Sequence, residues 1–239
     1  MNADGSRLLR AARLSSVPGL HHGFEIGLAA APGLARELGR QRVAQSLSSC
    51  GQCFFLRQVH ADSVVEAPWE GTPDGDAGLA WRAGDIVAVE TADCVPILLA
   101  DPETRLAAAV HAGWRGAAHA IARMAVEALA ARGARPERIV AAVGPCIGAC
   151  CYEVGPELRA RFEPEAQSFF RPAQRDRFRL DLRGLVQRQL ESVGVLQARI
   201  DHVALCTSCA PARLPSYRRD GPACGRIVSF VGWGSASTN

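Results

Sequence analysis

The stretch VETADCVPILLADPETRLAAAVHAGWRG, residues 89–116, contains two nearly uninterrupted apolar runs separated by a turn at Asp101-Pro102. Apolar runs without polar alternation are typical of strands that are buried on both faces of a sheet. Cys94 begins the first run, and His111 lies near the end of the second. The segment therefore predicts two neighbouring buried strands that carry a thiol and an imidazole among core residues.

Outward from this pair, strand and helix patterns alternate along the chain without a linker or an internal repeat. The stretch 67–84, rich in Pro and Gly, is predicted to be a loop. This order predicts one α/β (α+β) domain over residues 1–239, built on sheet with covering helices. Helices are expected at 34–48, 116–133 and 182–194, and strands at 53–60, 85–101 (two strands hinged near 91–94), 105–114, 138–148, near 200–209 and 226–233.

The charged residues exclude several functions. All 27 basic residues are Arg, against 24 acidic residues, for a net charge of +3. Without Lys the chain has no P-loop lysine, no pyridoxal Schiff base and no lysine general base. The small net charge and the absence of a basic run argue against general nucleic-acid binding.

The N-terminal segment and the cysteine count indicate a cellular setting. Residues 1–20 contain no apolar stretch long enough for a signal peptide or a membrane span. The nine cysteines are an odd number, which favours reduced thiols over a disulfide framework. We therefore expect a cytoplasmic protein with no membrane partner, in which some thiols are ligands.

Three potential metal ligands lie at predicted strand ends, namely His60, Cys94 and His111. Neighbouring strands are only about 5 Å apart, so three strand ends can converge. Two imidazoles and a thiolate suit a catalytic zinc with an open position, or a blue-copper site. The spacing of the three residues alone leaves an alternative without a metal. In it His60 is a hydrogen-bonded core histidine, Cys94 a small buried thiol and His111 a turn residue.

Other cysteines have weaker patterns. Two CxxC pairs, Cys50/Cys53 and Cys206/Cys209, allow a joint zinc site with four thiolate ligands, but their separation is far beyond that of a zinc ribbon. We therefore expect these four cysteines to be dispensable for metal binding. Cys150 and Cys151 would point to opposite faces of a strand, so a structural role is predicted for both.

Several polar residues near the predicted strand ends are candidates for substrate contacts. Arg115 follows Trp114 just past His111 and can reach a phosphate, or alternatively form a surface ion pair. A second candidate set, expected to rim an anionic substrate, is Tyr217, Arg218 and Arg219. For Asp93 we expect turn capping or support of Cys94 rather than a role as general base, and for His119 an exposed helix position.

Five motifs taken together resemble the laccase-domain family, whose members are also described as multicopper polyphenol oxidoreductase-like proteins, purine nucleoside phosphorylases and peptidoglycan-editing factors. The resemblance covers roughly residues 55 to 230. It implies a layered sandwich fold and a mononuclear zinc centre held by His60, Cys94 and His111. The motifs, in the family's order, are RQVHAD (57–62), TADCVPILLAD (91–101), AAVHAGWRG (108–116), VGPCIGACCYEVG (143–155) and SYRRDG (216–221).

The resemblance also implies the chemistry. It points to a zinc-dependent purine nucleoside phosphorylase that also acts as adenosine deaminase and methylthioadenosine phosphorylase, with purine nucleosides and phosphate as substrates. His60, Cys94, His111 and Arg115 would be the catalytic residues.

Three alternatives stay open. Cys94 could instead be the nucleophile of a peptidoglycan-editing hydrolase that removes a misplaced serine from a UDP-muramyl precursor. Copper-dependent polyphenol oxidation suits the chain less well, because a multinuclear copper centre needs more imidazoles than the six histidines readily supply. A non-enzymatic module stabilised by its metal is the third alternative.

The sequence departs from the family pattern at two places. The stretch 21–39 lacks the family's Thr-Arg step, which puts any phosphate contact made there in doubt. In the predicted helix after residue 181, Val186 stands where relatives often carry Asn.

Overall fold

A six-stranded sheet is built around the two strands of the segment 89–116. The computed structural model describes residues 8–26, 34–210 and 214–235. In it β7 (Val95–Asp101) and β8 (Leu106–Ala112) pair antiparallel, and every residue of both is buried. The sheet has the order β13-β9-β7-β8-β5-β4, whose remaining strands are β13 (Ile200–His202), β9 (Val140–Val143), β5 (Ala77–Ala80) and β4 (Val64–Glu66).

A second, five-stranded sheet has the order β1-β2-β14-β6-β3. Its central strand, β14 (Ile227–Trp233), is the last strand in the sequence and pairs antiparallel with both neighbours. Alternate residues of β6 point to opposite faces: Val87 and Val89 toward the other sheet, Ile86 and Ala88 away from it. The other strands are β1 (Leu8–Leu9), β2 (Leu20–Ile26), β6 (Asp85–Thr91) and β3 (Gln52–Phe55).

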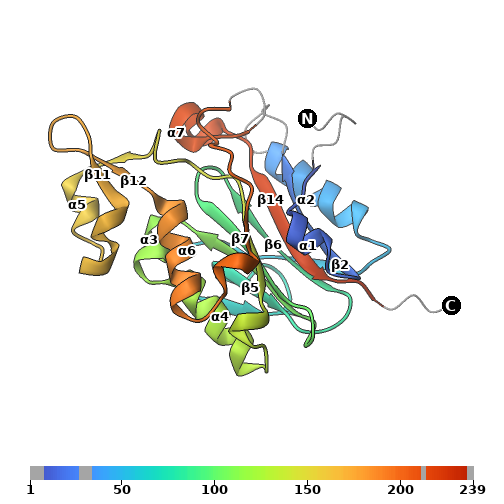
Figure 1. The fold of residues 1–239 in the computed structure, drawn as a ribbon. Coiled ribbons are helices and arrows are strands. Elements are labelled where there is room, and N and C mark those ends of the chain that lie inside the picture. The colour runs from blue at the N-terminus through green and yellow to red at the C-terminus, as the bar shows by residue number, and fades with distance from the viewer. Residues whose placement is uncertain (1–7, 27–33, 211–213, 236–239) are drawn as a thin grey trace.

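The two sheets pack face to face and helices cover their outer faces (Figure 1). The helices α4 (Ile121–Ala131) and α6 (Leu182–Ser192) lie on the six-stranded sheet, whereas α2 (Leu34–Ser46) lies on the five-stranded one. The result is the predicted α/β layered sandwich of mixed sheets flanked by helices. None of the described helices has the length and apolar composition needed to cross a bilayer.

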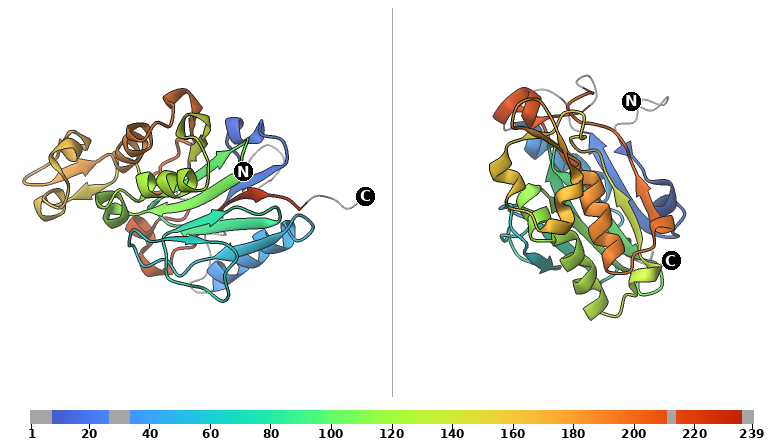
Figure 2. Two further views of the ribbon diagram at one scale, coloured as in Figure 1. Left: turned by 90° about the horizontal axis from the view of Figure 1, so that it is seen from below. Right: turned by 60° about the vertical axis from the view of Figure 1, so that its left-hand side comes forward.

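A small third sheet, β10-β12-β11, projects with α5 from one end of the molecule, beside α3 and α6 (Figures 1 and 2). Short helical turns connect the larger elements. The bounds of these elements are β10 (Glu153–Val154), β11 (Phe170–Pro172), β12 (Phe178–Leu180), α1 (Ala12–Ser15), α3 (Trp114–Ala118), α5 (Pro156–Arg159), α7 (Tyr217–Asp220) and the 3-10 turns Pro136–Arg138, Pro164–Phe169, Gln197–Arg199 and Gly221–Ala223.

Five predicted elements differ from the structure. The loop expected at 67–84 contains β5, and the strand expected near 200–209 is confined to β13. The strand expected at 53–60 ends at Phe55, so His60 lies in a loop and not at a strand end. The helix expected at 116–133 is two helices, α3 and α4, because the backbone at Ala120 adopts a left-handed conformation with φ 58°. The expected strand at 138–148 is confined to β9, and the residues after it form turns.

Candidate functional site

Cys94 and His111 meet because β7 and β8 are antiparallel neighbours. Cys94 immediately precedes β7, and His111 is the next-to-last residue of β8, where it pairs with Pro96. The start of one strand therefore lies beside the end of the other. This placement follows directly from the two apolar runs and the turn between them.

His60 is brought to the same edge by a buried carboxylate that sequence reasoning missed. Asp76 precedes β5 and is fully buried. Its side chain accepts hydrogen bonds from the backbone N–H groups of Val59, His60 and Ala61, at 3.3, 3.1 and 2.7 Å. Three donors on one carboxylate hold this loop in place, and His60 takes a positive φ of 60° within it.

Asp76 also orients the second imidazole. Its Oδ1 lies 2.6 Å from Nδ1 of His111, and its carbonyl accepts the His111 N–H at 2.7 Å. A carboxylate on one ring nitrogen of a histidine leaves the other nitrogen available as a ligand. The Nε2 atom of His111 is therefore directed toward Cys94 and His60.

The ligand atoms of His60, Cys94 and His111 lie within 4.8 Å of one another. The two imidazole rings are perpendicular, with centroids 4.7 Å apart. A Cβ at Gly113 would stand 3.1 Å from both the Cys94 sulfur and the His60 ring, so the backbone here approaches the three donors closely. A thiolate and two imidazoles at this separation fit a tetrahedral zinc with its fourth position open.

The thiol and the imidazole form a coupled pair. Burial opposes ionisation of Cys94, but His111 and His60 outweigh it and lower the pKa of the thiol to about 6. Burial likewise opposes protonation of His111, yet Cys94 and Asp76 together raise its pKa. The pair therefore favours the thiolate of Cys94, which is the form that binds a metal or attacks as a nucleophile.

The three donors open onto a cavity of about 550 Å³, a size typical of small-molecule sites. Arg115, Tyr217 and Arg218, all selected from the sequence, line it. Burial raises the pKa of Tyr152 in its wall, with a further contribution from Cys94, so that hydroxyl stays protonated. The other lining residues are Gln58, Glu90, Ala92, Asp93, Ile147, Leu182 and Arg226.

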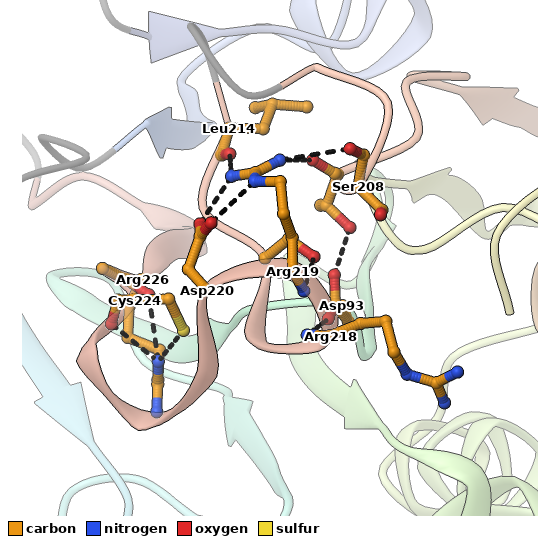
Figure 3. Close-up of polar contacts among 11 residues, drawn as sticks. Asp93, Ser208, Leu214, Arg218, Arg219, Asp220, Cys224 and Arg226 are labelled. Carbon is orange, nitrogen blue, oxygen red and sulfur yellow. Dashed lines mark hydrogen bonds and ion pairs between the residues drawn. The ribbon is translucent and has the colours of Figure 1, made fainter.

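Arg219 is not among the residues that line the cavity, contrary to the sequence expectation. Its guanidinium donates to the carbonyls of Thr207, Ser208 and Leu214 and pairs with Asp220 (Figure 3). These contacts hold the loop before α7, whose N-cap is Ser216. The side chain of the preceding residue, Arg218, points away from this cluster, and Arg226 supplies a cavity arginine that the sequence did not indicate.

Asp93 joins two segments of the cavity wall to the turn that contains Thr207. Its carboxylate accepts from the Thr207 hydroxyl and, at 2.6 Å, from the Arg218 backbone N–H (Figure 3). Its carbonyl accepts the Ile147 N–H at 2.9 Å. Asp93 has a positive φ of 85° directly before Cys94, which turns the chain between β6 and β7. These contacts agree with the expected turn-capping and supporting role.

Four further cysteines come together outside the cavity, and they are not the four that the CxxC pairs suggested. Cys206 and Cys209 join Cys150 and Cys151, with all four sulfurs within 4.8 Å of one another. Cys150 and Cys151 lie in a turn and not in a strand, so the prediction that they point to opposite faces is wrong. The pair Cys50/Cys53 belongs to neither of the two donor groups found among the described residues.

The two departures from the family pattern fall in different surroundings. Residues 27–33, within the stretch that lacks the Thr-Arg step, lie outside the described residues. Val186 is fully buried in α6, where it packs in the core beneath the six-stranded sheet. His119 is exposed at the end of α3, as expected.

Comparison with known proteins places this site in a family. A purine nucleoside phosphorylase of Deinococcus radiodurans is 37% identical over 97% of this chain and 95% of its own length. One of Streptomyces coelicolor is 40% identical over 80% of each chain. Among solved structures, YlmD of Geobacillus stearothermophilus has a TM-score of 0.84 at 28% identity over 97% of both chains.

A second solved structure, protein NMB0706 of Neisseria meningitidis, has a TM-score of 0.85 at 29% identity, over 97% of this chain and 100% of its own. The family model described as multi-copper polyphenol oxidoreductase laccase matches residues 35–234, a range that includes His60, Cys94, His111 and the cavity around them. The chain belongs to this laccase-like family.

Proposed function

We propose that the chain is a cytoplasmic, zinc-dependent purine nucleoside phosphorylase that also deaminates adenosine and cleaves methylthioadenosine with phosphate. The relatives named purine nucleoside phosphorylase support the phosphorylase part of this proposal. Deamination and the cleavage of methylthioadenosine follow from the family resemblance, and the choice of zinc rests on the chemistry of the donor set.

One observation carries the proposal: the His60, Cys94 and His111 donors open onto the same cavity as three arginines, Arg115, Arg218 and Arg226. Guanidinium groups are the side chains best suited to bind phosphate. A structural metal is normally enclosed by four protein ligands, whereas this donor set has three and faces open space. The arrangement therefore favours an enzyme over a metal-stabilised binding module.

Zinc fits the donor set. His60, Cys94 and His111 would hold it, with Asp76 fixing the tautomer of His111 and the loop of His60. Bound there, zinc would act as a Lewis acid toward an oxygen in the cavity. Among the described residues, the second donor group is all cysteine, so no further imidazole cluster supports a multinuclear copper oxidase.

The surrounding side chains divide the remaining work. In phosphorolysis a phosphate oxygen forms a bond to C1′ while the bond from C1′ to the purine nitrogen breaks and the base takes up a proton. Arg115, Arg218 and Arg226 would bind and orient the phosphate. Tyr217, an exposed aromatic residue in the cavity wall, is the side chain best placed to stack on the purine, since Arg218 already lies over the ring of Tyr152. Deamination of adenosine uses water at C6 of the purine and needs no phosphate. Both reactions would therefore use the same cavity, but only phosphorolysis would need the bound phosphate.

Cys94 also supports a second candidate, a hydrolase with a cysteine nucleophile acting on a muramyl precursor. The lowered pKa of Cys94 beside His111 is the feature that favours it. A thiolate bound to zinc is a poor nucleophile, so the two functions require different states of the same sulfur. Alkylation of Cys94 that zinc does not slow would favour the hydrolase.

The decisive assay follows purine base and ammonia separately, with inosine or adenosine, in the presence and absence of phosphate. We expect base release only with phosphate, and ammonia from adenosine in both conditions. Methylthioadenosine should release adenine only with phosphate. If zinc-loaded protein yields neither purine product, the nucleoside function is wrong and the muramyl hydrolase becomes the better candidate.

The variant Arg115→Ala should reduce phosphorolysis more than deamination. A charge-assisted contact to an anion contributes about 1.5–3 kcal/mol, and the exposure of Arg115 reduces this to about a tenfold loss in kcat/KM for phosphate. Arg123→Ala is the matched control, because Arg123 is an exposed arginine of α4 that pairs with Glu127 and does not line the cavity. Equal losses in both reactions would remove Arg115 from phosphate binding.

A further inference from the structure

The four-cysteine cluster, Cys150, Cys151, Cys206 and Cys209, lies where two chain segments leave neighbouring parallel strands. β13 pairs with β9, and beyond both strands a bridge pairs Cys146 with Cys206. The Thr207 N–H donates to the Cys146 carbonyl at 3.0 Å. The backbone therefore holds the turn at 148–151 against the turn at 206–209 before any bond between sulfurs is considered.

The separations between the sulfurs have the size expected around a metal. The Cys209 sulfur is 3.6 Å from that of Cys150 and 3.3 Å from that of Cys151, and all four sulfurs lie within 4.8 Å of one another. Four sulfurs at about 2.3 Å from a tetrahedral zinc are about 3.8 Å apart, whereas a disulfide brings two sulfurs to about 2.05 Å. All four cysteines are free.

Backbone N–H groups around the cluster are directed at a sulfur and lie close to it. The Cys206 sulfur accepts a hydrogen bond from the Gly148 N–H at 3.3 Å and another from the Cys209 N–H. A Cβ at Gly148 would stand 3.1 Å from the Cys150 sulfur, so the backbone passes close to the sulfurs here. A CxxC turn with N–H groups directed at its sulfur suits a zinc-binding loop.

We propose that Cys150, Cys151, Cys206 and Cys209 form a structural Zn²⁺ site, separate from the His60, Cys94 and His111 centre. Four thiolates complete the coordination of zinc and leave no position for substrate. Four thiolates in mutual contact repel one another without a cation, so metal binding and deprotonation of these cysteines occur together.

The site would stabilise one wall of the cavity. Ile147 and Tyr152, on either side of the first turn, line the cavity, and Thr207 in the second turn donates to Asp93 next to Cys94. Zinc between the two turns ties these residues together. Its role is therefore to keep the cavity wall in place, and the proposal does not depend on which reaction the cavity performs.

Metal content of the full chain tests the site. Purified from zinc-supplemented medium, the protein should hold two zinc ions per chain by elemental analysis. His60→Ala should retain one, and the double variant Cys206→Ser/Cys209→Ser should retain the other. Cys50→Ser/Cys53→Ser is the matched control, a CxxC pair outside the cluster, and should keep both. Unchanged zinc in Cys206→Ser/Cys209→Ser would overturn the proposal.

A spectroscopic measurement keeps the test valid if the serine variant fails to fold. In the His60→Ala protein, zinc absorption fine structure should show a shell of four sulfurs at about 2.3 Å. The same protein loaded with cobalt should show the strong thiolate charge-transfer bands of a tetrahedral site. A His60→Ala protein that holds no zinc, or whose zinc has nitrogen or oxygen ligands, would contradict the proposal. A disulfide among the four cysteines in a reducing buffer would contradict it as well.

Discussion

Asp76 is the residue on which the geometry of the metal donors depends most. One carboxylate accepts three backbone N–H groups of the His60 loop and contacts Nδ1 of His111. Burial works against its ionisation, but His111 and these donors keep its pKa below the usual range. Neither histidine would keep its orientation if this side chain could no longer accept all four hydrogen bonds.

The variant Asp76→Asn should weaken zinc binding at the His60, Cys94 and His111 centre. The amide replaces one acceptor oxygen with a donor facing N–H groups, and loss of such an outer partner typically costs about 10–100-fold in metal affinity. Competition with a chromophoric chelator measures the change. Asp74→Asn is the control, because Asp74 is half-exposed and pairs with Arg57 at the surface. An affinity for zinc that does not change in Asp76→Asn would show that the loop keeps its shape without the carboxylate.

Residue identities could be predicted where they belong to contiguous motifs and not where they act from a distance. Cys94 and His111 lie within the apolar runs that also specify their strands. Asp76 lies 16 positions after His60 in the sequence, so no contiguous motif connects the two. Gly75 and Gly78, on either side of Asp76, are the local sequence feature that sets this segment apart. Arg226 and Tyr152 face the cavity only because of tertiary packing, so no spacing in the sequence indicated them.

At the scale of elements, the strands with the longest apolar runs were the ones predicted well. The strand predicted at 53–60 was too long because the apolar pattern continues through Leu56, past the end of β3 at Phe55. In the His60 loop the backbone N–H groups donate to the carboxylate of Asp76 and not to a neighbouring strand. The division of the helix at 116–133 has no local signal, because alanine-rich sequence contains no breaker. It occurs at Ala120, between the end of α3 at Ala118 and the start of α4 at Ile121, and both helices pack on the sheet.

Replacing Ala120 with Gly should stabilise the protein by about 0.5–1 kcal/mol. A left-handed backbone costs a residue with a Cβ about 1–2 kcal/mol, and the greater freedom of Gly in the unfolded chain offsets part of the gain. Chemical denaturation compares the variants. Ala128→Gly, in the middle of α4, should instead lower the free energy of unfolding by about 0.5–1 kcal/mol. If Ala120→Gly lowered the free energy of unfolding as much as Ala128→Gly does, the expectation would be wrong.

For the whole molecule, the sequence predicted the class but not the number of layers. Alternating elements indicate sheets covered by helices, whereas the face-to-face packing of two sheets depends on pairings across the full chain, such as β2 with β14. His22 lies in that pairing, almost fully buried, and accepts the Ala11 N–H through Nε2. Burial, together with Arg10, lowers its pKa to about 4.

Stability should fall as the pH is lowered from about 7 to about 5, and His22 should contribute to the loss. Between its unfolded pKa of 6.5 and its folded value of about 4, the unfolded chain binds the additional proton, so the free energy of unfolding decreases as the pH falls. The expected contribution is on the order of 1–2 kcal/mol. Denaturation of His22→Gln at both pH values should show a smaller decrease than the parent. The exposed His119→Gln is the control and should behave like the parent.

The central position of β14 in the five-stranded sheet has a consequence for biosynthesis. β14 separates β2 from β6, so each of these earlier strands lacks its neighbour on that side until residues 227–233 have been made. During translation β2 and β6 leave the ribosome with unpaired edges and an apolar face, which are the features that recruit chaperones. Within the part of the chain that the structure describes, the six-stranded sheet ends at His202 and can assemble earlier. In a nascent chain stalled before Ile227, the six-stranded sheet could therefore already bring His60, Cys94 and His111 together. The five-stranded sheet of the same chain would still lack its central strand.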